Sequence, residues 1–165
     1  MGGLTSEETA ALVRWTKDAG IETFVEIGTL FGLTARTVAE ETGKNVVAVD
    51  NFCWNPFGLT AEQHEAFARR IVAGSGVELV KSDAIDFLGR LSCRIDAARA
   101  LVFLDGSHAY DDVKREIETC IAQGVKTISG HDFDNARFGV SRAVRETVGE
   151  PDEVCGMCWI RRLRQ

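Results

Sequence analysis

Short apolar runs alternate with longer amphipathic runs over most of the chain. The apolar runs occupy residues 23–28, 45–50, 77–82, 100–106 and 125–130. Around them, apolar positions recur at helical spacing in residues 5–20, 33–42, 60–74, 83–91, 110–124 and 139–149. Short apolar strands that alternate with helices are typical of a parallel sheet covered on both faces. The pattern therefore predicts a doubly wound, Rossmann-like α/β fold with a mostly parallel sheet.

The two ends of the chain are expected to frame this sheet. Thr5 or Ser6 can cap a first helix, and Gly20 can close it. Residues 152–163 have the pattern of a hairpin or an antiparallel edge strand. Because no linker divides the 165 residues, we expect a single domain over residues 1–165.

The helix that follows residue 59 has the clearest start signal. Thr60 and Gln63 have the spacing of a capping box, in which each side chain bonds the backbone N–H of the other residue. Ala66, Phe67 and Ile71 fall on one stripe of this helix. We expect that stripe to face the sheet.

Charge and composition exclude several classes of function. The formal net charge is −6 and the isoelectric point is about 5.1, so no nucleic-acid partner is expected. We interpret the basic cluster Arg161, Arg162 and Arg164 as a solvated tail. No run approaches the roughly 18 apolar residues of a membrane span, and the N-terminus lacks a secretion signal. With five cysteines, an odd number, these features predict a cytoplasmic protein with reduced thiols and no membrane partner.

An acidic residue lies at or just past the end of each of the five predicted parallel strands. These residues are Glu26, Asp50, Asp83, Asp105 and Asp132. Open α/β sheets bind their ligands at the carboxyl edge of the parallel strands. We therefore expect the five side chains to gather along one edge of the sheet and to form a ligand site.

The segment EIGTLFG, residues 26–32, joins the first predicted strand to a helix. Gly28 and Gly32 can adopt positive φ and let a ligand approach the backbone, although a plain tight turn would use them in the same way. Their spacing is not that of the dinucleotide fingerprint, and the segment lacks the lysine of a nucleotide P-loop. A ligand without phosphate is therefore favoured.

The acids beside this turn suit a cationic nucleoside such as S-adenosylmethionine. Glu26 would attract its ammonium group, and Asp50 has the reach to accept hydrogen bonds from both ribose hydroxyls. Asp83 would accept a hydrogen bond from the adenine amine; a helix-capping role remains open for Asp50 and for Asp83. The expected cofactor-binding residues are Glu26, Gly28, Thr29, Gly32, Asp50, Asn51, Asp83, Ala84 and Asp105.

A second group of polar residues follows the fourth and fifth predicted strands. Asp105 and His108 come after the fourth strand, and His131 and Asp132 come at the end of the fifth. Because neighbouring strand ends converge, these groups predict an oxygen-rich site that suits a hard divalent cation such as Mg²⁺. A cation there would hold substrate oxygens and lower the pKa of a hydroxyl group.

Five segments carry a resemblance to a known family. They are VEIGTLFG, VVAVD, SDAIDFL, LVFLDGSHAYDDVKREI and SGHDF, and they lie between about residues 22 and 146. In these segments the chain resembles class I S-adenosylmethionine-dependent methyltransferases, and among them the methyltransferase domain 24 family, which includes sugar O-methyltransferases of macrolide biosynthesis. The resemblance implies methyl transfer to a hydroxyl group of a small molecule, assisted by a divalent metal ion.

The same resemblance implies roles for individual residues. Metal-dependent members use an acid after the fourth strand and an acidic pair after the fifth, which implies Asp105 and Asp132 as metal ligands. His131 stands at the first place of that pair; it either joins them as a ligand that favours Zn²⁺, Mn²⁺ or Fe²⁺, or supports them from outside the ligand shell. His108, with Asp105, is implied as catalytic, because a histidine, which titrates near pH 6.5 when unperturbed, can act as general base at that position.

Other interpretations stay open. The domain could bind S-adenosylmethionine or its demethylated product without turnover, or it could bind a nicotinamide dinucleotide. The absence of a sizeable insertion between strands suggests a homo-oligomer in which a second subunit completes the acceptor pocket.

Two further motifs carry less weight. Cys155 and Cys158 have redox or zinc spacing, but no second cysteine pair accompanies them, so we interpret them as structural. Phe52, Trp54 and Phe57 lie in the loop after Asp50, within NFCWNPFG, where they either wall the ligand pocket or pack the loop down.

Overall fold

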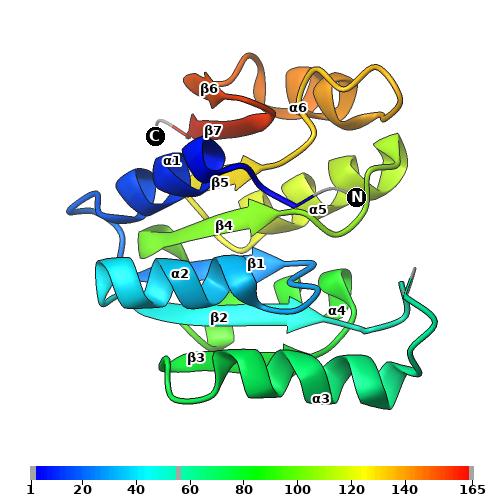
Figure 1. Ribbon diagram of the computed structural model, residues 1–165. Helices are drawn as coiled ribbons and strands as arrows, with labels where there is room; N and C mark the ends of the chain where they lie inside the picture. Colours follow the sequence, from blue (N-terminus) through cyan, green and yellow to red (C-terminus); the bar gives the residue numbers. More distant parts are fainter. Residues whose placement is uncertain (1–2, 55–56, 164–165) are drawn as a thin grey trace.

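In the part of the chain that the structure describes, residues 3–54 and 57–163, one sheet contains seven strands in the order β3-β2-β1-β4-β5-β7-β6 (Figure 1). The structure is a computed structural model. The strands are β1 (Thr23–Ile27), β2 (Asn45–Asp50), β3 (Val77–Lys81), β4 (Ala100–Leu104), β5 (Thr127–Gly130), β6 (Glu153–Cys155) and β7 (Cys158–Arg162). The first five pair in parallel, whereas β7 is antiparallel to β5 and to β6. The predicted mostly parallel sheet with an antiparallel C-terminal strand is confirmed.

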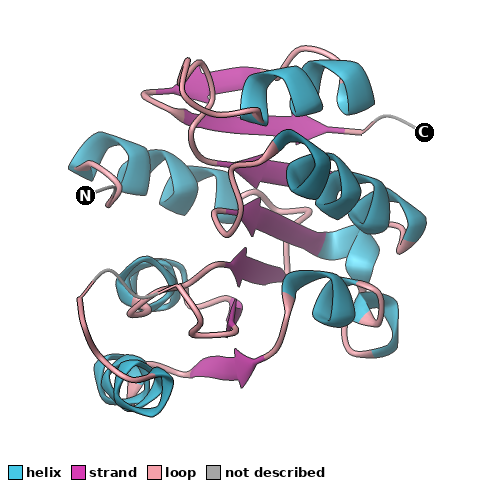
Figure 2. Cartoon of the chain, turned by 90° about the vertical axis from the view of Figure 1, so that its right-hand side faces the viewer, coloured by secondary structure: helices cyan, strands magenta, loops and turns pink. Residues whose placement is uncertain are grey.

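Helices cover both faces of this sheet (Figure 2). They are α1 (Ser6–Thr16), α2 (Leu33–Thr42), α3 (Ala61–Val72), α4 (Ala84–Leu88), α5 (Tyr110–Ala122) and α6 (Val140–Val148). Apolar residues of α4, α5 and α6 form one core cluster with one face of the sheet, and those of α1 and α2 form a second cluster with the other face. Both β1 and β4 are buried on both faces; β4 is apolar throughout, and β1 is apolar except at Thr23 and Glu26.

The first helix begins as expected but ends earlier. Thr5 is its N-cap, and a capping box with Glu8 is present, in which the Glu8 carboxylate accepts the Thr5 N–H at 2.7 Å. The helix ends at Thr16, so the prediction that Gly20 closes it is wrong. Residues 17–20 instead form a turn, and this turn lets Ile21 enter the core ahead of β1.

The buried face of α3 also differs from the prediction. The capping box of Thr60 and Gln63 is present, but His64, Ala68 and Val72 face inward, while Phe67 is 50% exposed. The prediction that Ala66, Phe67 and Ile71 form the buried stripe of this helix is therefore wrong. A polar residue decides the register of this helix: the buried His64 ring lies edge-on to Phe52, and its Nε2 bonds the Leu30 carbonyl oxygen at 3.0 Å.

Several helices and strands are shorter than predicted. β4 ends at Leu104, so Asp105 belongs to the following turn, and β5 begins at Thr127 rather than at residue 125. The helix predicted over 83–91 ends at Leu88 and is followed by a short 3₁₀ turn, Leu91–Cys93. These shifts leave the order of elements unchanged.

The basic C-terminal cluster is only partly a tail. Arg161 and Arg162 lie within β7, and the Arg161 guanidinium pairs with Asp152 at 2.8 Å, so the interpretation as a solvated tail is wrong for these two residues. Arg164 lies outside the described residues. Within the described ranges, no helix is both long enough and apolar enough to cross a membrane.

Ile117 tests how strongly α5 is held against the sheet. Its side chain is fully buried, whereas Ile121, one turn further along the same helix, is 42% exposed. We expect Ile117→Ala to lower the free energy of unfolding by about 2–5 kcal/mol, because it removes packed atoms and leaves a cavity. Ile121→Ala should stay within about 0.5 kcal/mol of wild type. Urea titration measures both, and equal losses would contradict this packing.

Candidate cofactor and metal site

The parallel pairing places the ends of β1, β2, β4 and β5 at one edge of the sheet. Glu26 in β1 lies level with Ala48 in β2 and with Phe103 in β4, and Leu104 lies level with Gly130 in β5. The strand order reverses between β1 and β4, since the chain runs outward from β1 to β3 and then returns. Ligands of open α/β sheets bind at such a switch point.

The turn after β1 lies directly against the end of β4. Gly28 has φ +86°, and a Cβ atom there would come within 2.5 Å of the Asp105 carbonyl oxygen. Gly32, with φ +80°, is the N-cap of α2 and leaves similar room for Val72 of α3. Both glycines are therefore needed for close packing of this turn, and their role in ligand approach stays a prediction.

Glu26 is a buried carboxyl group at the base of this turn. The hydroxyl group of Thr29 donates a hydrogen bond to it. Burial raises the pKa of Glu26 to about 8, against the lowering effect of the Thr29 bond, and the nearby charges of Asp105 and Asp50 raise it further. Such a group is protonated near neutrality unless a cation comes to it.

Asp50 is held at the end of β2 by two backbone groups. Its Oδ2 accepts the Leu30 N–H at 2.8 Å and its Oδ1 accepts the Phe52 N–H at 2.7 Å. These bonds tie the turn after β1 to the turn after β2 and fix the carboxylate at the sheet edge. Each oxygen retains a lone pair, which leaves Asp50 able to accept further hydrogen bonds.

Asn51 and Asp83 lie together at the ends of β2 and β3. The Asn51 amide donates to the Asp83 carboxylate at 2.9 Å. Asp83 occupies the N-cap position of α4, but its side chain makes no capping hydrogen bond, so helix capping does not explain it. Ala84 follows as the first residue of α4 and is half-buried.

A histidine and two aspartates meet after β4 and β5. The Nδ1 atom of His131 lies 3.5 Å from Asp105 Oδ1 and 3.5 Å from Asp132 Oδ2. One ligand atom from each residue lies within 4.8 Å of the other two, a spacing that would fit a metal ion. His108 borders this group, with its Nδ1 3.3 Å from Asp132 Oδ2 and its ring stacked on Phe138.

The charges in this group are not balanced by the protein. Burial raises the pKa of the Asp105 carboxyl group, and hydrogen bonding to His131 only partly offsets this rise. Burial alone would lower the pKa of His131, but its hydrogen bond to Asp105 and the negative charges of Asp105, Asp132 and Glu8 raise it to about 9. Excess negative charge at a buried site favours a bound cation.

Asp132 adopts an unusual backbone conformation. Its φ is +58°, in the left-handed region that costs energy for residues other than glycine. The Asn135 amide donates to its Oδ1 at 2.8 Å, and the next residue, Phe133, donates its N–H to the Met157 carbonyl oxygen at 2.9 Å. These contacts hold the carboxylate toward His108 and His131.

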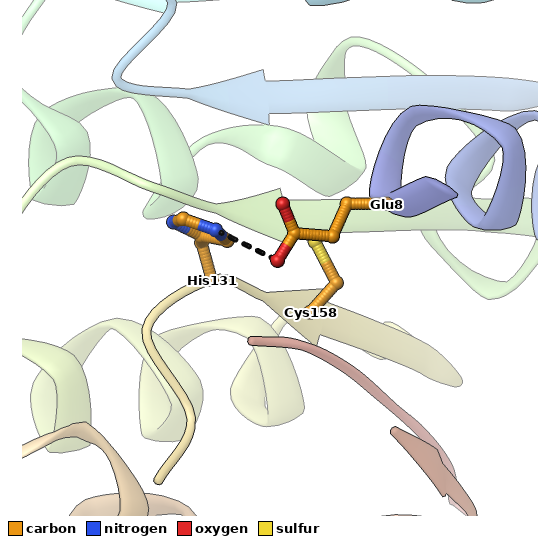
Figure 3. A group of neighbouring side chains, drawn as sticks. All are labelled: Glu8, His131 and Cys158. Carbon is orange, nitrogen blue, oxygen red and sulfur yellow. Dashed lines mark ion pairs between the residues drawn. The ribbon is translucent and has the colours of Figure 1, made fainter. Parts of the chain in front are cut away.

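Glu8 also belongs to this region, and the sequence did not indicate it. The carboxylate projects from α1, and its Oε1 lies 3.5 Å from His131 Nε2 (Figure 3). It also accepts the Met157 N–H at 2.7 Å, beneath a hairpin turn where a Cβ on Gly156 would collide with Glu8. Only its capping-box spacing to Thr5 was visible in the sequence, and that spacing indicates a helix start.

The aromatic loop after β2 is divided in the structure. Phe52 is buried against His64 and packs the loop down, whereas Trp54 is exposed. The Phe57 ring lies 5.2 Å from that of Phe31, beside the turn after β1. Phe52 is thus excluded as a pocket wall. Residues 55–56 of this loop lie outside the described ranges.

Residues 25–127, more than half of the chain, match the profile of methyltransferase domain 24, described as a methyltransferase domain. The chain belongs to this family. The matched residues run from β1 to β5 and include both the glycine turn and Asp105. Among curated proteins, no sequence matches the chain.

Solved methyltransferases share the fold of this family member. The calicheamicin methyltransferase CalS11 aligns with a TM-score of 0.70 and 18% identity over 93% of this chain and 76% of its own. An O-methyltransferase from Bacillus cereus gives 0.70 and 16%, over 96% and 80% of the two chains. TomG from Streptomyces achromogenes gives 0.69 and 14%, over 98% and 82%. The Rossmann-like fold of class I methyltransferases, implied by the resemblance, is confirmed.

Glu26 gives this methyltransferase domain a predicted pH dependence. Its pKa is about 8 in the folded protein and about 4.5 in a solvated chain, so the folded state binds the extra proton between these values. Stability from this group is therefore present below pH 4.5 and is lost as pH rises through 8. In Glu26→Gln, unfolding followed from pH 5 to 8 should show a shallower fall, by about 1.4 kcal/mol per pH unit at most.

The exposed Glu7 on α1 supplies the control, since Glu7→Gln should leave the slope unchanged. Parallel stability curves for wild type and Glu26→Gln would contradict a protonated Glu26. The buried Glu116, whose pKa burial also raises to about 8, contributes to the slope of both proteins equally.

Proposed function

We propose that this protein transfers the methyl group of S-adenosylmethionine to a hydroxyl group of a small molecule. A divalent cation bound by Asp105 and Asp132 would assist the transfer, and Mg²⁺ is the ion we favour. One observation carries the proposal: two sets of acids meet at the same sheet edge, with the turn at Gly28 packed directly against Asp105. One set suits a cationic nucleoside, and the other suits a cation with an oxygen ligand.

The cofactor half of the site uses Glu26 and Asp50. Glu26 would face the ammonium group of S-adenosylmethionine. This positive charge would stabilise the ionised form of the buried carboxyl group. Asp50, fixed by the turns at Leu30 and Phe52, would accept the ribose hydroxyls. Asp83, which makes no capping bond, would face the adenine, with Asn51 and Ala84 beside it.

Relatives in fold support the choice of cofactor and reaction. The structure of the Bacillus cereus O-methyltransferase contains SAH, and that of TomG contains SAM. CalS11 is described as a TDP-rhamnose 3′-O-methyltransferase. A sugar or another natural-product hydroxyl is therefore the acceptor class we favour.

The donor set after β4 and β5 fits a divalent cation. Two carboxylates and an imidazole nitrogen lie within range of one ion, and their negative charge exceeds what His131 can neutralise. A bound cation would orient the acceptor oxygen and lower the pKa of its hydroxyl group. His131 would support the site through Nδ1, either as a third ligand or as a donor to the carboxylates.

His108 is placed to remove the acceptor proton. If its Nδ1–H donates to Asp132, its Nε2 carries the lone pair that a general base needs. Phe138 stacks on the ring at 4.6 Å and also lines an open hollow of about 510 Å³ with Asn135 and Arg142. The acceptor would enter by this hollow and approach the sulfonium methyl group in line.

Two variants should separate the halves of the site. Asp50→Asn should weaken S-adenosylmethionine binding about 10- to 100-fold, because it removes a charged acceptor, and should leave Mn²⁺ binding unchanged. Asp132→Asn should do the reverse, because it removes a carboxylate ligand. Calorimetry measures the cofactor, and electron paramagnetic resonance measures Mn²⁺ as a probe for Mg²⁺.

The same titrations decide against the alternatives. Tight binding of a nicotinamide dinucleotide by wild type would overturn the proposed reaction. Binding of S-adenosylmethionine without methyl loss over a panel of sugar and phenol acceptors, with Mg²⁺ present, would favour a binding module. Equal Mn²⁺ binding by Asp132→Asn and wild type would show that the metal-ligand assignment is wrong.

His108→Ala should lower kcat by about 10²- to 10⁴-fold while the affinity for S-adenosylmethionine stays near the wild-type value. The substitution removes the base and leaves the residues around Glu26 and Asp50 in place. Single-turnover methylation measures the loss, and calorimetry checks the cofactor. Undiminished turnover at neutral pH would exclude His108 as the base.

A further inference from the structure

We propose that Glu8, His131 and Cys158 form a second, buried metal site. It would bind a metal ion of borderline softness, and Zn²⁺ is the ion we favour. The three side chains come from α1, from the residue after β5 and from β7, and they point toward one another (Figure 3). This buried cluster shares His131 with the proposed catalytic metal site, but the proposal does not depend on the methyl-transfer reaction.

The distances in the buried cluster suit ligands of a shared ion. One atom each of Glu8, His131 and Cys158 lies within 4.8 Å of the other two, and Glu8 Oε1 lies 3.5 Å from His131 Nε2. Two ligands each about 2.0–2.1 Å from a tetrahedral zinc ion are separated by about 3.3–3.4 Å. The observed separation is close to that value, and it also lies in the range of a direct ion pair between histidine and a carboxylate.

The His131 Nε2 atom is the strongest sign of a missing ligand. It is fully buried, and no described residue makes a hydrogen bond with it. On the opposite side of the ring, Nδ1 faces Asp105 and Asp132, which accept hydrogen bonds when ionised and can hold a ring proton at Nδ1. Without an ion, a doubly protonated His131 pairs with Glu8; loss of the Nε2 proton to water would free its lone pair for a metal ion between His131 and Glu8.

This arrangement is typical of histidine bound to zinc. Such a histidine almost always donates its other N–H to a carboxylate, a backbone carbonyl oxygen or water, which fixes the ring orientation. Asp105 and Asp132 fill that role for His131 and remain available for a separate hard cation. One imidazole would thus join two sites of different chemistry.

The donor atoms of the buried cluster favour zinc over Mg²⁺. A thiolate and an imidazole prefer borderline ions, whereas Mg²⁺ prefers oxygen ligands. Cys158 is fully buried and carries a free thiol, and on binding an ion its S–H bond would break, its proton would go to water and an S–metal bond would form. Thiolate and carboxylate together would neutralise the ion, and a water molecule would take the fourth position.

The proposed ion would act as a structural clamp. It would join α1 to β7 through Glu8 and Cys158, next to the turn where Glu8 accepts the Met157 N–H. Because His131 also contacts Asp105, the clamp would fix the imidazole that faces the proposed catalytic cation.

Cobalt(II) provides a direct test, because a thiolate ligand gives Co²⁺ an intense near-ultraviolet charge-transfer band that oxygen and nitrogen ligands do not give. We expect the full-length protein, reduced and stripped of metal, to develop this band with one equivalent of Co²⁺ and to lose it on addition of Zn²⁺. Cys158→Ser should abolish the band and weaken Zn²⁺ binding by more than about 100-fold, beyond the loss typical of an outer-shell partner.

Cys120→Ser is the matched control. Cys120 is equally buried, but it lies on α5 in the other core cluster, so its replacement should leave the band intact. Loss of the band in both variants, or its absence from wild type, would overturn the proposal. Glu8→Gln should keep a sulfur-derived band but weaken Zn²⁺ binding, whereas Glu7→Gln should do neither.

X-ray absorption of zinc-loaded wild type keeps the test decisive if Cys158→Ser does not fold. We expect one sulfur at about 2.3 Å and nitrogen or oxygen neighbours at about 2.0 Å. A shell of nitrogen and oxygen alone would place the ion at Asp105 and Asp132 and would overturn the buried site. S-adenosylmethionine binding by the metal-free protein, measured separately, reports on the methyltransferase proposal alone.

Discussion

Negative charge gathered at one edge of a parallel sheet is the constraint on which the rest of this structure depends. The strands must run in parallel for their carboxyl ends to meet, and each end then contributes an acid to the same small region. Three features of the protein offset this charge. Burial raises the pKa of Glu26 and favours its protonated form, and backbone N–H groups donate hydrogen bonds to Asp50. His131 lies among the carboxylates of Glu8, Asp105 and Asp132.

His131 connects the parts of this edge. One ring nitrogen faces Asp105 and Asp132, at the side where His108 lies, and the other faces Glu8 and Cys158 in the interior. An aspartate or glutamate at the position of His131 would direct its carboxylate to only one of these two groups of side chains. The histidine at this position therefore brings side chains of α1 and β7 next to the group formed by Asp105 and Asp132.

Much of this edge was predictable from sequence because the signals are local. An apolar run that ends in an acid fixes both a strand and the place of its carboxylate, and Glu26, Asp50, Asp105 and Asp132 all lie at the expected edge. Contacts between distant segments left no such signal. Glu8 was not singled out in the sequence, because its partners His131 and Met157 are brought to it by the fold. The inward face of α3 was missed for a similar reason, since His64 is polar in sequence but buried between Phe31 and Phe52.

The contact between Gly28 and Asp105 leaves the two halves of the edge little freedom to move separately. The backbone of one turn rests on the backbone of the other, with no side chain between them to yield. A ligand that shifted the Gly28 turn would therefore press on the backbone at Asp105, and a ligand at Asp105 would press on the turn in return. If two ligands bind here, thermodynamic linkage would make these two influences equal in free energy, so that each ligand would change the affinity for the other by the same factor.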